Sequence, residues 1–136
     1  MVRCMGFAKA KFKVVGDKGS LEGTAIADTG SLMSVIDEIL VDKLGLKYTG
    51  RALELTTLSG EEITSNEALI NAFEVEGERL VSERVAICKL PNNVKEKLRA
   101  MGAHEQVIIG VITLEAAGLT VNPLKGRLEK VGWLTL

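Results

Sequence analysis

The sequence predicts an all-β fold with one or two short helices, because of its composition and the spacing of its apolar residues. Hydrophobic residues make up 46% of the 136 residues, and aromatic residues only 4%. The core must therefore be built mainly from Val, Ile, Leu and Ala, which suit closely packed sheets. Residues 8–15 alternate between apolar and polar side chains, which is the two-residue period of a strand. A chain of this length and composition fits one globular domain over residues 1–136.

The first third of the chain is predicted to hold a hairpin, a loop and a short helix. Residues 8–15 and 21–27 flank a turn rich in glycine and charge, so they form the two strands of one hairpin. The second strand leads directly to Asp28. After the loop, Asp37 is placed to cap a helix that ends at Gly45.

The rest of the chain is predicted to be mainly strand. Residues 51–90 form two long hairpins, with turns at 59–61 and 76–78. The spacing of apolar residues then predicts a surface helix over 93–101. Beyond it we expect a buried strand at 107–109, about two helical turns at 112–117, and short strands at 119–121, 127–131 and 133–136.

The sequence contains a faint internal repeat, and only one of its two copies carries an acidic residue in the loop. A strand, a glycine-containing loop and a short helical segment occur in residues 21–44 and again near 107–117. The first copy carries a carboxylate in its loop, and the second does not. One chain therefore holds half of any site that needs two paired acids.

Charge and cysteine content narrow the classes of function. The 17 basic and 18 acidic residues leave a net charge of −1, which argues against nucleic acid or a membrane surface as the main partner. Lys9, Lys11 and Lys13 fit the wet face of the first strand. We expect a cytoplasmic protein, because no apolar segment resembles a secretory signal or a membrane span. Cys4 and Cys88 are expected to be free thiols.

Asp28 is the residue best placed for chemistry. It directly follows an apolar strand, and the next two residues are Thr29, with a small hydroxyl, and Gly30, which allows close backbone approach. An isolated buried carboxylate is costly, so it must be hydrogen-bonded, paired or protonated, and two facing carboxylates would share a proton. A structural reading also exists, because an aspartate in a turn commonly bonds its own backbone.

The loop Asp28-Thr29-Gly30-Ser31 resembles the active-site loop of the retropepsin-like, or retroviral-type, aspartic proteases. The second half of the chain supports the resemblance. There, Ile108, Ile109 and Gly110 are similar to the two-apolar-plus-glycine signature of microbial members, and residues 114–123 to the segment that follows it. Order and spacing agree over about residues 8–133. The resemblance implies a closed acid-protease barrel that forms a homodimer.

The resemblance also implies a role for each residue of the loop. Asp28 would be the catalytic carboxylate, and two of them, one from each subunit, would activate a water to hydrolyse a peptide or protein substrate without cofactor or metal. Thr29 would hold the opposite loop across the dimer, and Gly30 would permit that approach. Ser31 would hydrogen-bond the carboxylate from outside. The substrate-covering flap of the family falls on Leu58, Ser59, Gly60 and Glu61.

The sequence departs from the retroviral pattern at one position and is compatible with other functions. Retroviral members carry an arginine after the glycine of the second signature, whereas this chain has Val111, so the dimer must be held differently. A chain with this fold could instead be an inactive dimerisation or peptide-binding module, although intact Asp28, Thr29 and Gly30 favour the enzyme. A purely structural β domain would require both signatures to be coincidental. The single histidine, His104, lies in a polar connection and has no neighbouring metal ligands.

Overall fold

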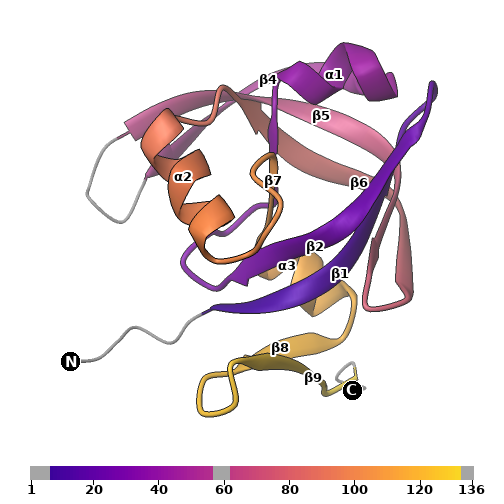
Figure 1. Ribbon diagram of the computed structural model, residues 1–136. Helices are drawn as coiled ribbons and strands as arrows, with labels where there is room; N and C mark the ends of the chain where they lie inside the picture. Colours follow the sequence, from indigo (N-terminus) through magenta and orange to yellow (C-terminus); the bar gives the residue numbers. More distant parts are fainter. Residues whose placement is uncertain (1–6, 57–61, 133–136) are drawn as a thin grey trace.

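The computed structural model describes residues 7–56 and 62–132. Most of these residues lie in strands, and six of the strands form a closed barrel (Figure 1). The strands are β1 (Phe7–Val15), β2 (Ser20–Asp28), β3 (Val35–Asp37), β4 (Lys47–Thr56), β5 (Glu62–Val75), β6 (Glu78–Cys88), β7 (Val107–Ile109), β8 (Leu119–Asn122) and β9 (Arg127–Lys130). The helices are α1 (Ile39–Leu44), α2 (Asn92–Ala100) and α3 (Val111–Ala116). The candidate flap at 58–61 and the expected strand at 133–136 lie outside the described residues.

The barrel closes through a pairing between β1 and β5. The ring follows the order β1, β2, β7, β3, β6, β5, and β1 then pairs with β5 from Phe12 opposite Val75 to Val15 opposite Ala72. In the described residues β4 pairs with β5 alone, so it is attached to the ring without being part of it. β8 and β9 form a separate hairpin below the barrel in Figure 1. The predicted β barrel is thereby confirmed.

The alternation along β1 fills the inside of the barrel. Ala8, Ala10, Phe12 and Val14 are buried, whereas the lysines between them are exposed or half-buried. Among the described residues, Phe12 and Phe73 are the only aromatic side chains in the buried core. The rest of that core is aliphatic apart from Cys88, as the composition predicts. Its tight packing over the barrel axis holds β2 and β7 in fixed positions.

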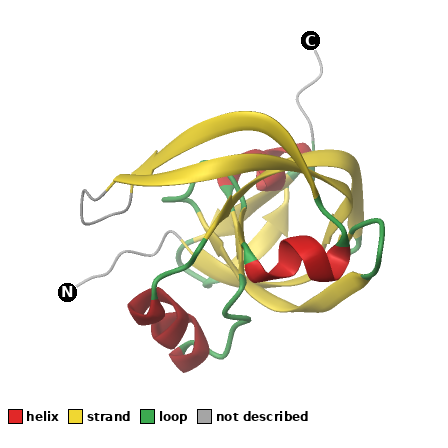
Figure 2. Ribbon diagram, turned by 90° about the horizontal axis from the view of Figure 1, so that it is seen from above, coloured by secondary structure: helices red, strands yellow, loops and turns green. Residues whose placement is uncertain are grey.

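Three short helices are found in the described residues, where one or two were expected; Figure 2 shows them around the strands. α3 corresponds to the two helical turns expected at 112–117 and begins and ends one residue earlier. The start of α1 also differs from the prediction. Asp37 ends β3 and the cap position is Glu38, although the Asp37 carboxylate accepts the Ile39 N–H at 3.1 Å. The end is as predicted, with Gly45 left-handed at φ 72°.

The surface helix α2 is tied to the barrel by a buried ion pair. Lys95 Nζ lies 2.7 Å from Asp37 Oδ2, and the two side chains are only 22% and 3% exposed. Leu98 is buried on the same helix, and the chain leaves it at Gly102 with φ 73°. The ion pair and the apolar contact together fix a helix that begins directly after Pro91.

Cys88 is a buried free thiol at the end of β6, as expected, whereas Cys4 lies outside the described residues. Burial raises the pKa of the Cys88 thiol, and the neighbouring Ser65 hydroxyl opposes that rise in part. A thiol of this kind is mostly protonated at neutral pH and is shielded from reagents.

His104 lies in the polar connection between α2 and β7, where it is half-buried and packs against the barrel. Its backbone N–H donates to Thr24 at 2.8 Å, and its ring meets Phe12 edge to face with centroids 5.7 Å apart. The Nδ1 atom accepts the Gln106 N–H at 3.2 Å, which requires the neutral ring. Burial lowers the pKa of His104 below its ordinary value, while neighbouring charges act in both directions.

We predict that His104 makes the protein less stable in mild acid. A histidine whose pKa is lowered on folding contributes its stability above its unfolded pKa, and that contribution is lost as the pH falls below this value towards the folded pKa. Urea unfolding between about pH 7.5 and about pH 5 should therefore show a smaller pH-dependent loss for His104→Asn than for the wild type. The asparagine retains an acceptor for Gln106. Equal pH dependence of the two proteins would contradict the prediction.

Candidate active site

Asp28 lies at the carboxyl end of β2, beside the carboxyl end of β7. The two strands run parallel and pair Ile26 with Ile108 and Ala27 with Ile109. Because this pairing lies within the barrel ring, it fixes the point at which the chain leaves β2. Asp28 itself is half-buried, and the next two residues are exposed. The barrel therefore presents the carboxylate at its surface directly after a rigid strand.

The loop folds the Asp28 carboxylate onto its own backbone. The Gly30 N–H donates to Asp28 Oδ1 at 2.8 Å, and the Ser31 N–H donates to the Asp28 carbonyl at 3.1 Å. These bonds orient one carboxylate oxygen. An aspartate in a purely structural turn makes the same contacts. The surroundings of the loop must therefore decide between the catalytic and the structural interpretation.

The hydroxyl of Ser31 was expected to hydrogen-bond the Asp28 carboxylate, but it has a different partner. It donates to the Met33 carbonyl at 2.7 Å, so its single proton is used within the loop and not on the Asp28 carboxylate. The physical reason is local: the turn brings the Met33 carbonyl, two residues further on, within reach of the side chain. Ser31 thus stabilises the segment that follows Asp28.

Gly110 lies against the backbone of the Asp28 loop. A Cβ atom at Gly110 would lie 2.3 Å from the Met33 carbonyl carbon and 2.7 Å from the Ser34 nitrogen, which is too close for any side chain. The glycine of the second signature is therefore required by the contact between the two loops. Ile108 and Ile109 precede it in β7, so the structure brings the second signature directly against the first.

Two backbone hydrogen bonds join the loops beside this contact. The Val111 N–H donates to the Ser31 carbonyl at 2.8 Å, and the Ile112 N–H donates to the Leu32 carbonyl at 3.0 Å. The first N–H groups of a helix have no partner within the helix. Here two N–H groups of the first turn of α3 donate hydrogen bonds to the loop that carries Asp28. The helix therefore positions the candidate catalytic loop.

A buried pair of hydroxyls completes the junction and was not predicted from the sequence. Ser34 Oγ and Thr113 Oγ1 are 2.6 Å apart, and Ser34 Oγ also accepts the Gly110 N–H at 2.9 Å. Both residues are 1% exposed. Each is a small polar residue within an apolar segment, Ser34 between Met33 and Val35 and Thr113 between Ile112 and Leu114. That isolated hydroxyl is the signal in the sequence that could have identified them.

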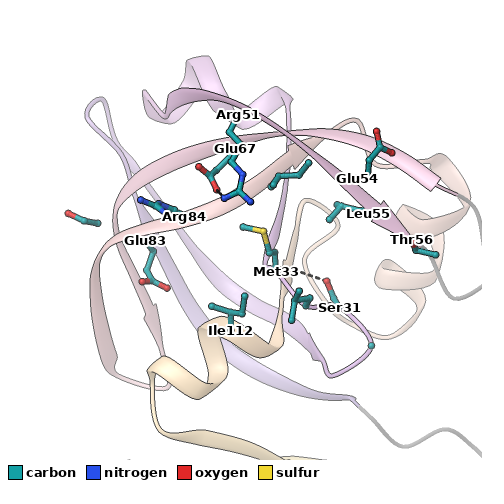
Figure 3. Close-up of a pocket in the computed structure, with 14 residues that line it drawn as sticks. Ser31, Met33, Arg51, Glu54, Leu55, Thr56, Glu67, Glu83, Arg84 and Ile112 are labelled. Carbon is teal, nitrogen blue, oxygen red and sulfur yellow. Dashed lines mark hydrogen bonds and ion pairs between the residues drawn. The ribbon is translucent and has the colours of Figure 1, made fainter.

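An open cleft of about 840 Å³ adjoins the loop (Figure 3). Its floor is formed by residues 30–33 and by Ile112 of α3, and its walls by β4, β5 and β6. The residues that line the walls are Arg51, Leu53, Glu54, Leu55, Thr56, Glu67, Ser82, Glu83 and Arg84. Of the predicted site residues, Gly30 and Ser31 line this cleft. Its volume lies within the range of ligand-binding clefts in proteins.

Within residues 7–56 and 62–132, no group of three or more His, Cys, Asp or Glu side chains is arranged to hold a metal ion. None of the helices in these ranges is long and apolar enough to cross a membrane.

A family model described as aspartyl protease matches residues 10–113, a range that holds both the Asp28 loop and Gly110. The chain belongs to the aspartyl protease family. A comparison with curated proteins found no match. Membership of this family supports peptide hydrolysis as the activity. It also favours the catalytic interpretation of Asp28, because the turn contacts alone are compatible with both interpretations.

The contact at Gly110 leads to a prediction about stability and activity. Gly110→Ala should lower the free energy of unfolding by about 1–3 kcal/mol or more, since the methyl group must displace the backbone at Met33. Urea unfolding followed by circular dichroism measures this change. The displacement also moves the Asp28 loop, so any peptide cleavage should fall with it.

Gly19→Ala is the matched control for this substitution. A Cβ at Gly19 meets nothing within 4 Å, so the same chemical change should alter stability by no more than about 0.5 kcal/mol. Similar losses of stability in the two variants would show that the loop contact is not the cause.

Proposed function

We propose that this chain is an aspartic endopeptidase of the retropepsin-like type, acting as a homodimer with one Asp28 from each subunit in a shared active site. One observation carries the proposal. The parallel strands β2 and β7 bring two related loops together, but the first carries Asp28 and the second carries Gly110. Aspartic proteases work with two carboxylates that share a proton. The second carboxylate is therefore expected from another copy of the chain.

The proposed chemistry uses a water molecule as the nucleophile. The ionised Asp28 accepts a proton from this water, while the protonated Asp28 of the other subunit donates to the oxygen of the peptide carbonyl. Attack of the water on the carbonyl carbon gives a tetrahedral intermediate. A proton then passes to the nitrogen of the leaving amine as the carbon–nitrogen bond breaks. No covalent bond forms between enzyme and substrate, and no cofactor is required.

The exposure of the loop supports a shared site. Thr29 and Gly30 are exposed at the tip of the loop, next to the half-buried Asp28. A twofold axis through this region would bring the same loop of each subunit together in an isologous contact. In this arrangement Thr29 holds the opposite loop, and Gly30 permits the approach. The adjoining open cleft supports an extended substrate that enters from the side, as an endopeptidase requires.

We predict that Asp28→Asn abolishes peptide cleavage and leaves the fold intact. The amide is nearly isosteric with the carboxylate but cannot accept the proton of the water, so kcat should fall by at least about 10³-fold. Cleavage of a varied peptide library, read by mass spectrometry, measures the activity. Asp42→Asn, on the exposed side of α1, is the matched control and should retain full activity.

The same variant tests whether the site is shared between two chains. If each site draws one Asp28 from each subunit, a mixed dimer of wild-type and Asp28→Asn chains is inactive. Excess mutant should then reduce the activity per wild-type chain in proportion to the fraction of wild-type partners. Native mass spectrometry confirms that mixed dimers have formed. Undiminished activity per wild-type chain would exclude the two-chain mechanism, even if Asp28 were essential.

Dilution supplies an independent prediction. Because a separated chain holds one carboxylate, specific activity should fall as the protein is diluted below the dissociation constant of the dimer. Sedimentation at the same concentrations should show the dimer disappearing in parallel. Constant activity across a range in which sedimentation shows only monomer would mean that one chain is sufficient.

A further inference from the structure

The cleft beside the Asp28 loop contains charged side chains that the proposed hydrolysis does not use. Met33, Leu53, Leu55 and Ile112 supply apolar surface at its centre and floor. The charged residues that line its walls are labelled in Figure 3: Arg51, Glu54, Glu67, Glu83 and Arg84. Their position in the cleft bears on what the cleft binds, since charged groups are rarely kept against apolar surface without a partner.

Glu67 is a buried carboxylate in the wall of the cleft. It is 5% exposed, and Thr49 Oγ1 donates to its Oε1 atom at 2.9 Å. Arg51 Nη1 lies 3.5 Å from its Oε2 atom. Thr49 and Arg51 flank Gly50, whose φ of 88° lies at an irregularity in the pairing of β4 with β5. The irregular backbone thus directs both neighbours of Gly50 towards one buried carboxylate.

This arrangement orients Arg51 while leaving most of its donors unused. A guanidinium has five N–H donors, and in the described residues Glu67 is the only side chain that accepts from this one, through a single long contact. The Arg51 side chain remains 65% exposed and reaches into the cleft (Figure 3). Because Glu67 already holds the side chain, a second carboxylate would bind a positioned group and lose less entropy on binding.

Arg84 places a second guanidinium on the same side of the sheet. Arg84 lies opposite Leu69 in the pairing of β5 with β6. Leu69 is two residues from Glu67 along β5, so the side chains of Arg84 and Glu67 lie on the same face of the sheet. Arg84 is exposed and has no ion pair within the described residues. Arg51 and Arg84 therefore share this face with one buried carboxylate, Glu67, which pairs with Arg51.

Within the described residues, the other two acids of the cleft form no ion pair with Arg51 or Arg84. Glu54 points away from the cleft in Figure 3 and accepts a hydrogen bond from Thr64 Oγ1 at 3.2 Å. Glu83 lies opposite Ile70, on the face of the sheet that faces the core, and points towards Ile112. Burial raises the pKa of the Glu83 carboxyl above its ordinary value. The positive end of the cleft is therefore local to Arg51 and Arg84.

We propose that Arg51, oriented by Glu67, acts with Arg84 to select peptide substrates that carry an acidic side chain at the position bound in this cleft. The carboxylate of that side chain accepts hydrogen bonds from the guanidinium groups, and apolar neighbours in the peptide contact Leu53, Leu55 and Met33. This inference rests on the proposed peptidase function and adds a substrate class to it. Arg51 and Arg84 determine specificity, whereas Glu67 is a positioning residue.

The test is a set of peptide pairs that differ by Glu or Gln at one position. For the wild type, one position should show kcat/KM about tenfold higher for Glu than for Gln, a typical value for a charge-assisted hydrogen bond. Added salt should reduce this ratio without affecting peptides that are apolar at that position. Arg51→Gln and Arg84→Gln should each lower the ratio, and Arg84→Glu should shift the preference to Lys.

Arg79→Gln is the matched control. Arg79 belongs to the same hairpin but pairs with Glu74 at 2.6 Å and does not line the cleft, so this variant should keep the wild-type preference. If Arg51→Gln fails to fold because Glu67 is left unpaired, the two Arg84 variants still decide the question. Equal kcat/KM for Glu and Gln at every position of a cleaved peptide would overturn the inference and leave the peptidase function standing.

Binding separates this inference from the proposed function if no peptide is cleaved. The same Glu and Gln peptides, labelled with a fluorophore, can be titrated with wild-type protein and followed by anisotropy. Tighter binding of the Glu peptide that is lost in Arg84→Gln would support the anion site in a protein without peptidase activity. Equal binding of both peptides would reject the site together with the activity.

Discussion

The contact between Gly110 and the backbone of Met33 and Ser34 is the constraint on which the candidate site depends. At 2.3 Å from a carbonyl carbon, a Cβ atom has no room, so the two loops can cross only where one of them has no side chain. Once they cross, the first N–H groups of α3 meet the carbonyls of the Asp28 loop. The position of Asp28 therefore follows from a steric requirement some 80 residues away in the chain.

The junction combines a rigid interior with an exposed tip. Inside the barrel, Ser34, Thr113 and the Gly110 N–H satisfy one another, so their burial does not leave a polar group without a partner. Outside, Thr29 and Gly30 remain accessible. A loop held firmly at its base and open at its end suits a site that a second molecule completes, because the partner meets a surface that is already ordered.

Local patterns in the sequence predicted much of the fold, whereas contacts between segments distant in the sequence could not be predicted from them. The hairpin of β1 and β2 follows from alternation and a turn. The two loop signatures could be recognised because they occur together, in the expected order and at the expected spacing. Asp37 was assigned to a helix cap because an aspartate before apolar residues looks the same at the end of a short strand. The contact of Glu67 with Arg51 depends on a strand irregularity that no local pattern indicates. The hydrogen bond of the Ser31 hydroxyl was expected to go to the Asp28 carboxylate, but it goes to the Met33 carbonyl. A backbone carbonyl can be supplied by any residue, so the sequence does not indicate this acceptor.

The attachment of β4 has a mechanical consequence. In the described residues this strand bonds to β5 and to no member of the ring on its other side, so the hydrogen bonds that close the barrel do not pass through it. Its outer end can bend away from the cleft without loosening the ring, while Glu67 fastens its inner end through Thr49 and Arg51. A displacement of β4 would cost its hydrogen bonds to β5, whereas the pairings that close the ring would remain.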